Sequence, residues 1–223
     1  MGIQAVLFDL DGTLADTALD LGGALNALLA RKGLPPQSMQ AIRPVASHGA
    51  SGLLYLGVGM TKDHPEHAAW RQEYLAEYER CFDRDTVLFD DVAELVSELV
   101  RRGVQWGIIT NKPKVFTDRL VPKLGFPVPP AVIVSGDTCD EAKPSVKPMM
   151  YACEHIGIKP EYCLYVGDAE RDMQAGKNAG MQTVLADWGY IADSDDTDSW
   201  PADFTVARPL EILDVLALAK TSV

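Results

Sequence analysis

The chain has 223 residues, of which 47% are hydrophobic and 23% are charged. This composition is that of an ordinary globular protein, and the length suffices for one large domain or two unequal ones. The formal net charge of -12 argues against a nucleic-acid partner, because a phosphate backbone is bound by a basic face. It does not exclude a small anionic substrate, since a metal ion and a few local cations can reverse the field inside one cleft.

The sequence indicates neither a membrane span nor an oxidising compartment. No uninterrupted apolar run approaches the ~18 residues that a spanning helix needs. The N-terminus lacks the basic and apolar pattern of a secretion signal. No C-x-x-C spacing occurs, so we expect a cytoplasmic protein with free thiols. The cysteines are Cys81, Cys139, Cys153 and Cys163.

The first predicted strand, Ala5–Phe8, leads directly into acidic residues in the stretch VLFDLDGTLAD. From Asp16 to about Asp85 the patterns are helical and no convincing strand is found. Leu19–Lys32 carries leucines and alanines on one face, and Glu66–Phe82 places aromatic residues four apart. We interpret this aromatic stripe as core packing, because a base-stacking platform is unexpected in so acidic a chain. The sequence therefore predicts an all-helical insert after the first strand.

Beyond this insert, apolar runs alternate with helical patterns. The further predicted strands are Gln105–Thr110, Ala131–Ser135, Cys163–Val166, Thr183–Ala186 and Phe204–Val206. Each run is short and apolar throughout, which is typical of parallel strands that are covered on both faces. Helices are predicted between them, each followed by a glycine that suits a helix end, at Asp91–Arg102, Lys147–Ile156 and Glu170–Ala179. The alternation predicts an α/β fold.

Polar residues follow the ends of several predicted strands, where ligands bind in α/β folds. Asp9 and Asp11 are two apart and face the same way, so their repulsion favours a bound cation or a proton. The other candidates are Thr110, Asn111, Lys143, Asp168 and Asp172. Taken singly, each has an ordinary explanation, such as a turn, a helix cap or a solvated lysine. Their combination favours a site in which acids and cations act together.

The motifs DLDGTLAD, ITN, KP and VGDAERD, in this order, resemble the four motifs of the haloacid dehalogenase (HAD) superfamily. The resemblance implies an α/β, Rossmann-like core with a parallel sheet flanked by helices, formed by residues 1–16 and 85–223. It also implies a helical C1-type cap, formed by residues 17–84. Further stretches such as ITNKP and DWGYI are similar to phosphoglycolate phosphatases and to N-acetylmuramic acid 6-phosphate phosphatases. One departure is KPSVKP, where Lys147 stands at a position that is often acidic.

The resemblance assigns roles to the residues at the strand ends. Asp9 is expected to be the nucleophile that becomes an aspartyl-phosphate, and Asp11 the general acid and base. Mg²⁺ is expected on the Asp9 carboxylate, the Asp11 backbone carbonyl and Asp168, with Asp172 as a ligand or as a partner of a metal-bound water. The expected phosphate clamp consists of Thr110, the Asn111 amide and Lys143.

Substrate choice is expected to depend on the cap. Arg43, Ser47, His48 and Gly49 stand where related caps face the active site, and Arg43 is a candidate ligand for a substrate carboxylate. A solvated cap surface is the alternative explanation for Arg43. The implied substrate is a small phosphomonoester, 2-phosphoglycolate or N-acetylmuramic acid 6-phosphate, and the implied assembly is a monomer or homodimer.

Two other functions are also compatible with the sequence. A sugar phosphomutase shares the same core and a similar cap. A non-enzymatic phospho-accepting regulatory domain also uses paired acids, Mg²⁺, a hydroxyl and a lysine. A metal-free dehalogenase is disfavoured by the second acid of the first motif, Asp11.

Overall fold

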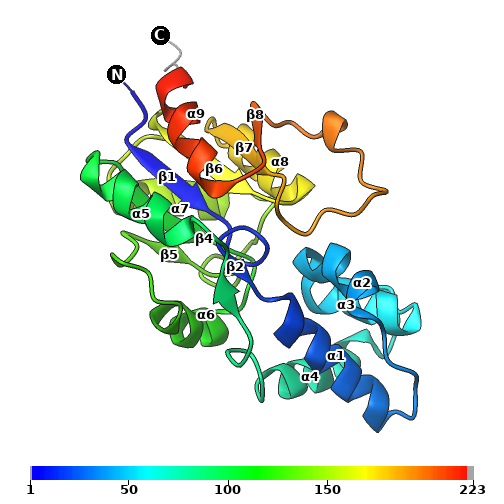
Figure 1. Cartoon of the computed structure of the whole chain (residues 1–223). Coiled ribbons are helices and arrows are strands. Elements are labelled where there is room, and N and C mark those ends of the chain that lie inside the picture. The colour runs from blue at the N-terminus through cyan, green and yellow to red at the C-terminus, as the bar shows by residue number, and fades with distance from the viewer. Residues whose placement is uncertain (1, 220–223) are drawn as a thin grey trace.

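A six-stranded parallel sheet forms the centre of the molecule (Figure 1). The structure is a computed structural model and describes residues 2–219. The strands lie in the order β5-β4-β1-β6-β7-β8, so β1 is flanked by β4 and β6. Their bounds are β1 Ala5–Phe8, β4 Gln105–Ile109, β5 Ile133–Val134, β6 Cys163–Gly167, β7 Gln182–Ala186 and β8 Phe204–Val206. All six predicted strands are confirmed, although β5 is shorter than expected because only two of its residues pair with β4.

Helices cover both faces of the sheet. Alternate side chains of β1 therefore belong to two separate hydrophobic clusters. Val6 and Phe8 belong to a large cluster with buried residues of α5 and α9, whereas Ala5 and Leu7 join residues of α7 and α8. The helices of this part are α5 Val92–Arg101, α6 Lys114–Leu120, α7 Lys147–Ile156, α8 Glu170–Asn178 and α9 Ile212–Leu218. The predicted α/β class is therefore confirmed.

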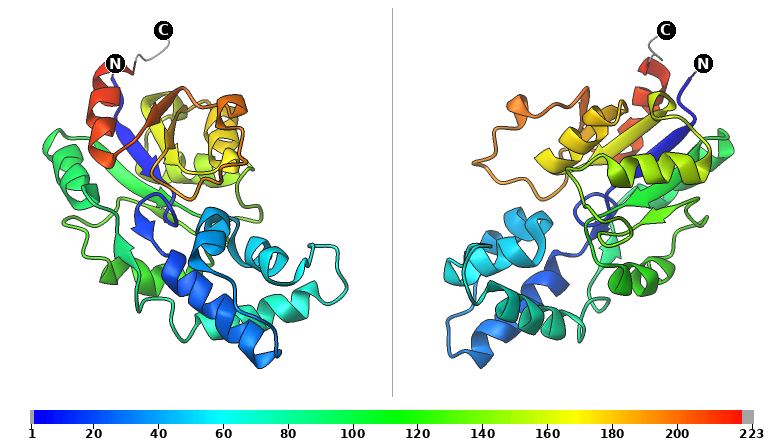
Figure 2. Two further views of the ribbon diagram at one scale, coloured as in Figure 1. Left: turned by 45° about the vertical axis from the view of Figure 1, so that its right-hand side comes forward. Right: turned by 180° about the vertical axis from the view of Figure 1, so that it is seen from behind.

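The helical insert, residues 17–84, lies beyond the carboxyl ends of the strands (Figure 2). It contains α1 Ala18–Arg31, α2 Met39–Ile42, the 3-10 helix η1 Arg43–His48, α3 Gly49–Val58 and α4 His67–Tyr78. The aromatic stripe on α4 packs inward as expected, because Tyr74 and Tyr78 stack with ring centroids 6.3 Å apart and both are buried. The large core cluster of the sheet continues into this insert.

A two-stranded antiparallel sheet brings the two ends of the insert together. Its strands are β2 (Ala15–Asp16) and β3 (Val87–Leu88), which pair Asp16 with Val87. Strands of two residues carry no periodic pattern, which is why the sequence does not predict them. Among residues 2–219, no helix combines the length and the low polarity that a membrane span requires.

Candidate active site

The polar residues singled out in the sequence gather at one edge of the sheet. Asp9 follows β1, Thr110 follows β4 and Asp168 follows β6, and these three strands are neighbours. The turn after Asp11 needs a glycine, because a Cβ atom on Gly12 would lie 2.1 Å from Asp168 Oδ2. Because these strands are adjacent, three motifs that are distant in sequence lie close together in the fold.

Three carboxylates form the centre of this cluster. Asp9, Asp168 and Asp172 each offer an oxygen, and these oxygens lie within 4.8 Å of one another. All three side chains are buried. Burial, followed by the charges of Asp9 and Asp172, raises the pKa of Asp168 to about 7. The pKa of Asp172 is also raised, chiefly by burial, with Lys143 acting against the rise. The cluster therefore has more negative charge than its protein surroundings compensate.

Lys143 is the buried cation of the cluster. Its Nζ lies 2.7 Å from Asp172 Oδ1 and 3.0 Å from Asp9 Oδ1. It also donates hydrogen bonds to the carbonyl of Ile109, at 2.8 Å, and to the hydroxyl of Tyr165, at 2.7 Å. A second cation, Arg171 at the start of α8, lies 3.8 Å from Asp9 Oδ2. These contacts fix the lysine beside two acids at the sheet edge.

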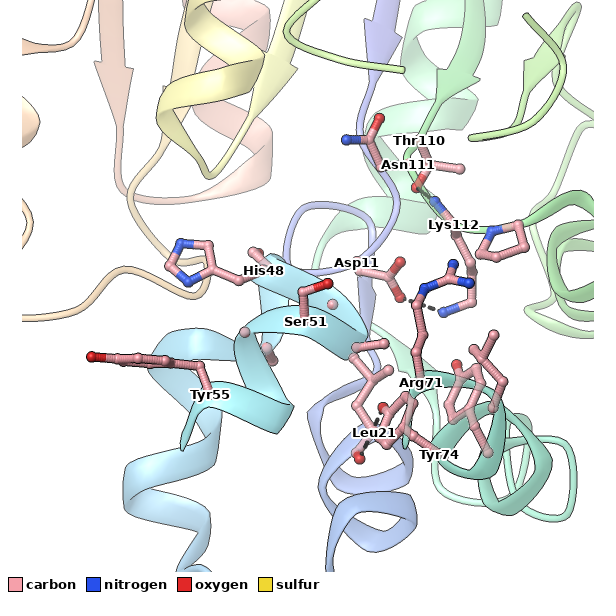
Figure 3. A pocket seen from close by; sticks show the side chains of 18 of the residues that line it. Asp11, Leu21, His48, Ser51, Tyr55, Arg71, Tyr74, Thr110, Asn111 and Lys112 are labelled. Atoms are coloured by element: carbon pink, nitrogen blue, oxygen red, sulfur yellow. Dashed lines mark hydrogen bonds and ion pairs between the residues drawn. The ribbon is translucent and has the colours of Figure 1, made fainter. Parts of the chain in front are cut away.

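The second acid of the first motif has a different partner. Asp11 is not a member of the three-carboxylate group, and its Oδ1 accepts a hydrogen bond from Lys112 Nζ at 2.7 Å (Figure 3). The Lys112 side chain is buried and lies over the ring of Tyr78, 4.8 Å from the ring centroid. One acid of the pair thus faces the carboxylate cluster, while the other faces the side where Tyr78 of the helical insert lies.

The residues after β4 have partly structural tasks. The Asn111 side chain forms two hydrogen bonds with the backbone of Lys143, accepting from N at 3.0 Å and donating to O at 2.9 Å. Thr110 Oγ1 accepts a hydrogen bond from the backbone N–H of Lys112 at 3.2 Å. The side chain of Asn111 therefore positions Lys143, and only its backbone N–H remains as a candidate for binding phosphate.

A cleft of about 620 Å³ lies between the sheet edge and the helical insert. From the sheet side it is lined by Asp9, Asp11, Thr110, Asn111, Lys112, Lys143 and Arg171. From the insert, the polar lining residues include Ser47, His48, Ser51, Tyr55, Lys62, Arg71 and Tyr74. Figure 3 shows the Arg71 side chain directed toward Asp11 and Lys112, whereas His48 and Tyr55 point to the other side. The size is that of a pocket for a small organic ligand.

Three of the cap residues named from the sequence, Ser47, His48 and Gly49, line this cleft, and Ser47 contacts the acid cluster. His48 and Gly49 are lining residues, and partial burial, followed by the charge of Arg171, lowers the pKa of His48. The hydroxyl of Ser47 donates a 2.6 Å hydrogen bond to Asp168 Oδ2. The helical insert therefore reaches the carboxylates directly.

Arg43 is placed differently from the sequence-based expectation, because it is not among the lining residues of the cleft. Its guanidinium forms a two-pronged pair with Asp16, with Nη2 at 2.9 Å from Oδ2 and Nη1 at 3.2 Å from Oδ1. It also lies 5.3 Å from the centroid of the Tyr190 ring. The carboxylate of Asp16 thus compensates the charge of Arg43, and the guanidinium faces β2 instead of the cleft.

Several residues of the site were missed in the sequence. Lys112 follows the ITN motif directly, and that position was its only signal. Arg71 and Lys62 carry no motif, because their approach to the cleft depends on how the insert packs on the sheet. The unusual Lys147 lies away from the site and pairs with Asp140 at 2.8 Å on the surface.

Residues 6–186 match the family model of the haloacid dehalogenase-like hydrolases. The chain belongs to this family. The sequence-based assignment, including its prediction of an enzyme of the hydrolase class, is therefore confirmed. The match extends over the strands β1 to β7 and over the whole helical insert.

Known proteins are similar over almost the full length of the chain. The N-acetylmuramic acid 6-phosphate phosphatase of Pseudomonas aeruginosa is 38% identical over 216 residues, which is 97% of this chain and 96% of that protein. The phosphoglycolate phosphatase of Xanthomonas campestris pv. campestris is 40% identical over 214 residues, 96% of each chain. A solved structure described as a predicted phosphoglycolate phosphatase of Haemophilus somnus has a TM-score of 0.83 at 25% identity, covering 96% of this chain and 97% of its own.

Proposed function

We propose that this member of the family is a Mg²⁺-dependent phosphatase that hydrolyses a small phosphomonoester. The observation that carries the proposal is the position of Asp9, which lies in the cleft within reach of two further acids and beside Lys143. Phosphoryl transfer depends mainly on positioning and on neutralising charge, and this set of groups supplies both. The phosphatase names of the two relatives at 38% and 40% identity support the same reaction.

The carboxylate cluster fits a hard divalent cation. Its donors are carboxylate oxygens, which Mg²⁺ prefers. Burial, and after it the charges of Asp9 and Asp172, raise the pKa of Asp168, and a cation would compensate these charges. The ligands would be Asp9, Asp168 and the Asp11 backbone carbonyl, with Asp172 binding directly or through a water. Bound Mg²⁺ supplies positive charge that lets a phosphate dianion approach these acids.

The proposed reaction has two steps, in which Asp9 is the nucleophile and Asp11 the general acid and base. An Asp9 oxygen attacks phosphorus and the bond from phosphorus to the leaving oxygen breaks, while Asp11 gives its proton to that oxygen. The product of this step is an aspartyl-phosphate and the free alcohol. In the second step the Asp11 carboxylate takes a proton from water as the water attacks phosphorus, which releases inorganic phosphate and restores Asp9. Thr110, the Asn111 backbone N–H and Lys143 hold the phosphoryl oxygens.

We also propose that the helical insert, residues 17–84, is the cap domain and that residues 1–16 and 85–223 form the catalytic core. The antiparallel pair of β2 and β3 is where the chain passes from one to the other. The hydrogen bond from Ser47 to Asp168 supports this division, because it closes the insert over the acids. The four free cysteines suit the cytoplasmic location expected from the sequence.

The substrate candidates are 2-phosphoglycolate and N-acetylmuramic acid 6-phosphate, the compounds named in the two relatives. A cleft of about 620 Å³ has room for the sugar, so we favour the muramic compound. A sugar phosphomutase is the second candidate, since it would use the same acids. A mutase would return the phosphoryl group to sugar, whereas the proposed enzyme transfers it to water.

The test is phosphate release from a panel of small phosphomonoesters with and without Mg²⁺. Wild type should release phosphate only with Mg²⁺, and Asp9→Asn should be inactive with an unchanged circular dichroism spectrum, because the amide keeps the shape and loses the nucleophile. Arg102→Gln, a change on the exposed end of α5, is the matched control. Release by Asp9→Asn within about tenfold of wild type, or full activity in excess EDTA, would contradict the proposal.

A further inference from the structure

Two basic side chains of the described residues have no carboxylate partner. Every lysine and arginine of residues 2–219 lies within ion-pair distance of a carboxylate, except Lys62 and Arg71. With 32 acidic residues against 20 basic ones, a carboxylate partner is easy to find on this surface. Two cations without one therefore stand out from the rest of the described chain.

Both exceptions line the same cleft as Asp9 and Asp11. Arg71 lies on the first turns of α4, and Lys62 lies in the segment between α3 and α4. Figure 3 shows the Arg71 side chain directed from its helix toward Lys112 and Asp11. The unpaired positive charges of Arg71 and Lys62 thus lie on the insert side of the cleft.

The cations on the opposite side of the cleft are already engaged. Lys143 contacts Asp9 and Asp172, Arg171 contacts Asp9, and Lys112 contacts Asp11. The cations of the sheet side are therefore committed to the acids of that side. Lys62 and Arg71 have no such acid to balance, so their charge is available to a second anionic group on the molecule in the cleft.

We propose that Arg71, assisted by Lys62, binds a carboxylate of the substrate at the insert side of the cleft. The inference rests on the proposed phosphatase function and adds to it the residues that recognise the carboxylate, a group that both candidate substrates carry. A guanidinium suits this ligand because its planar N–H groups match the two carboxylate oxygens.

The geometry also assigns this task to Arg71 in place of Arg43. Arg43 lies on the same insert, but its guanidinium is held by Asp16 and by the ring of Tyr190, outside the cleft. A substrate carboxylate would have to displace Asp16 to reach it. At Arg71 no protein carboxylate has to be displaced.

The test compares pairs of substrates in which one member carries a carboxylate and the other lacks it. N-acetylmuramic acid 6-phosphate and N-acetylglucosamine 6-phosphate form one pair, and 2-phosphoglycolate and ethyl phosphate form a smaller pair. Arg71→Ala should lower kcat/KM about 10- to 150-fold for the carboxylate member of the preferred pair, the range expected for a lost charged hydrogen bond. The value for the other member should stay within about twofold. Lys62→Ala should show the same selectivity with a smaller loss, because an ammonium is a single point of charge.

A control and a binding measurement separate recognition from general effects. Arg80→Ala removes one positive charge from the same insert, but Arg80 pairs with Glu77 outside the cleft, so both members of each pair should be unaffected. Calorimetric titration of the Mg²⁺-free protein, which does not turn over, should show weaker binding of the carboxylate member to Arg71→Ala than to wild type. Arg71→Lys should recover part of this binding.

The outcomes are distinct. If wild type hydrolyses phosphomonoesters but Arg71→Ala slows both members of a pair equally, Arg71 only attracts anions in general and the inference is overturned. Equal kcat/KM of wild type for both members would overturn it as well. If wild type releases no phosphate from any of the compounds, the proposed function itself fails, whatever the calorimetry shows for carboxylate binding.

Discussion

Lys143 Nζ lies 2.7 Å from Asp172 Oδ1, and both side chains are completely buried. The same ammonium is 3.0 Å from Asp9 Oδ1. Burying a charge is unfavourable unless partners surround it, and here each acid compensates part of the cost of the lysine. Three carboxylates nevertheless face two cations, Lys143 and Arg171, which leaves an excess of negative charge in the cluster.

Replacing Lys143 should therefore harm stability as well as activity. Lys143→Met keeps the length of the side chain but leaves Asp9 and Asp172 buried without their ammonium. We expect a loss of about 3–5 kcal/mol in the free energy of unfolding, the usual result of breaking a buried pair. Urea unfolding followed by circular dichroism measures it. Lys147→Met on the exposed start of α7 is the control and should change stability little. Equal effects of the two variants would show that the buried pair is not stabilising.

The excess charge also predicts how stability depends on pH and Mg²⁺. The pKa of Asp168 is about 7 in the fold against its usual 3.8. Between these values the folded state holds a proton that the unfolded chain has lost, so the metal-free protein loses stability as pH rises through this window. The full loss corresponds to about 4 kcal/mol, as an order of magnitude.

In the proposed metal site, Mg²⁺ would compete with the proton for this carboxylate, so Mg²⁺ should raise the melting temperature much more at about pH 8 than at about pH 5. Differential scanning fluorimetry in Mg²⁺ and in EDTA gives the comparison at each pH. Asp168→Asn, which cannot ionise, should remove most of the difference. A stabilisation by Mg²⁺ that is the same at both pH values would contradict this assignment.

Asp11→Asn should trap the enzyme after the first step. An activated aryl phosphate needs little protonation of its leaving group, so Asp9 should still be phosphorylated, whereas water is not activated afterwards. Intact-mass measurement after mixing should show one added phosphoryl group on Asp11→Asn and none on Asp9→Asn. If activity is lost and no phosphoryl group accumulates, Asp11 acts mainly through the geometry of the site and not as the general acid and base.

The residues that the sequence could locate are those whose position follows from the ends of strands. Asp9, Thr110 and Asp168 come directly after β1, β4 and β6, and neighbouring parallel strands bring such positions together. Lys143 was a weak candidate on its own, since a lysine in a loop has no periodic signal, and the resemblance gave it its role. For Asp9, Thr110 and Asp168, local sequence and sheet topology are sufficient.

The insert side of the cleft could not be predicted in this way. Which face of α4 meets the cleft depends on the packing of the insert against the sheet, so Arg71 looked like any other surface arginine. Arg43 was placed wrongly with respect to the cleft for a related reason. Its partner Asp16 belongs to a strand of two residues that no pattern reveals, and the ring of Tyr190 approaches from the far end of the chain.

Arg43→Ala tests whether Arg43 or Arg71 binds the substrate carboxylate. Because Arg43 contacts Asp16 and Tyr190 outside the cleft, its loss should cost about 1 kcal/mol in the free energy of unfolding, as a partly exposed ion pair and a cation–π contact together provide. The ratio of kcat/KM for N-acetylmuramic acid 6-phosphate over N-acetylglucosamine 6-phosphate should stay within about twofold of wild type. Urea unfolding and steady-state kinetics measure the two quantities. The inference would be wrong if this ratio fell about tenfold in Arg43→Ala and stayed unchanged in Arg71→Ala. Arg43 would then be the residue that binds the substrate carboxylate, and the insert would have to rearrange when the substrate binds.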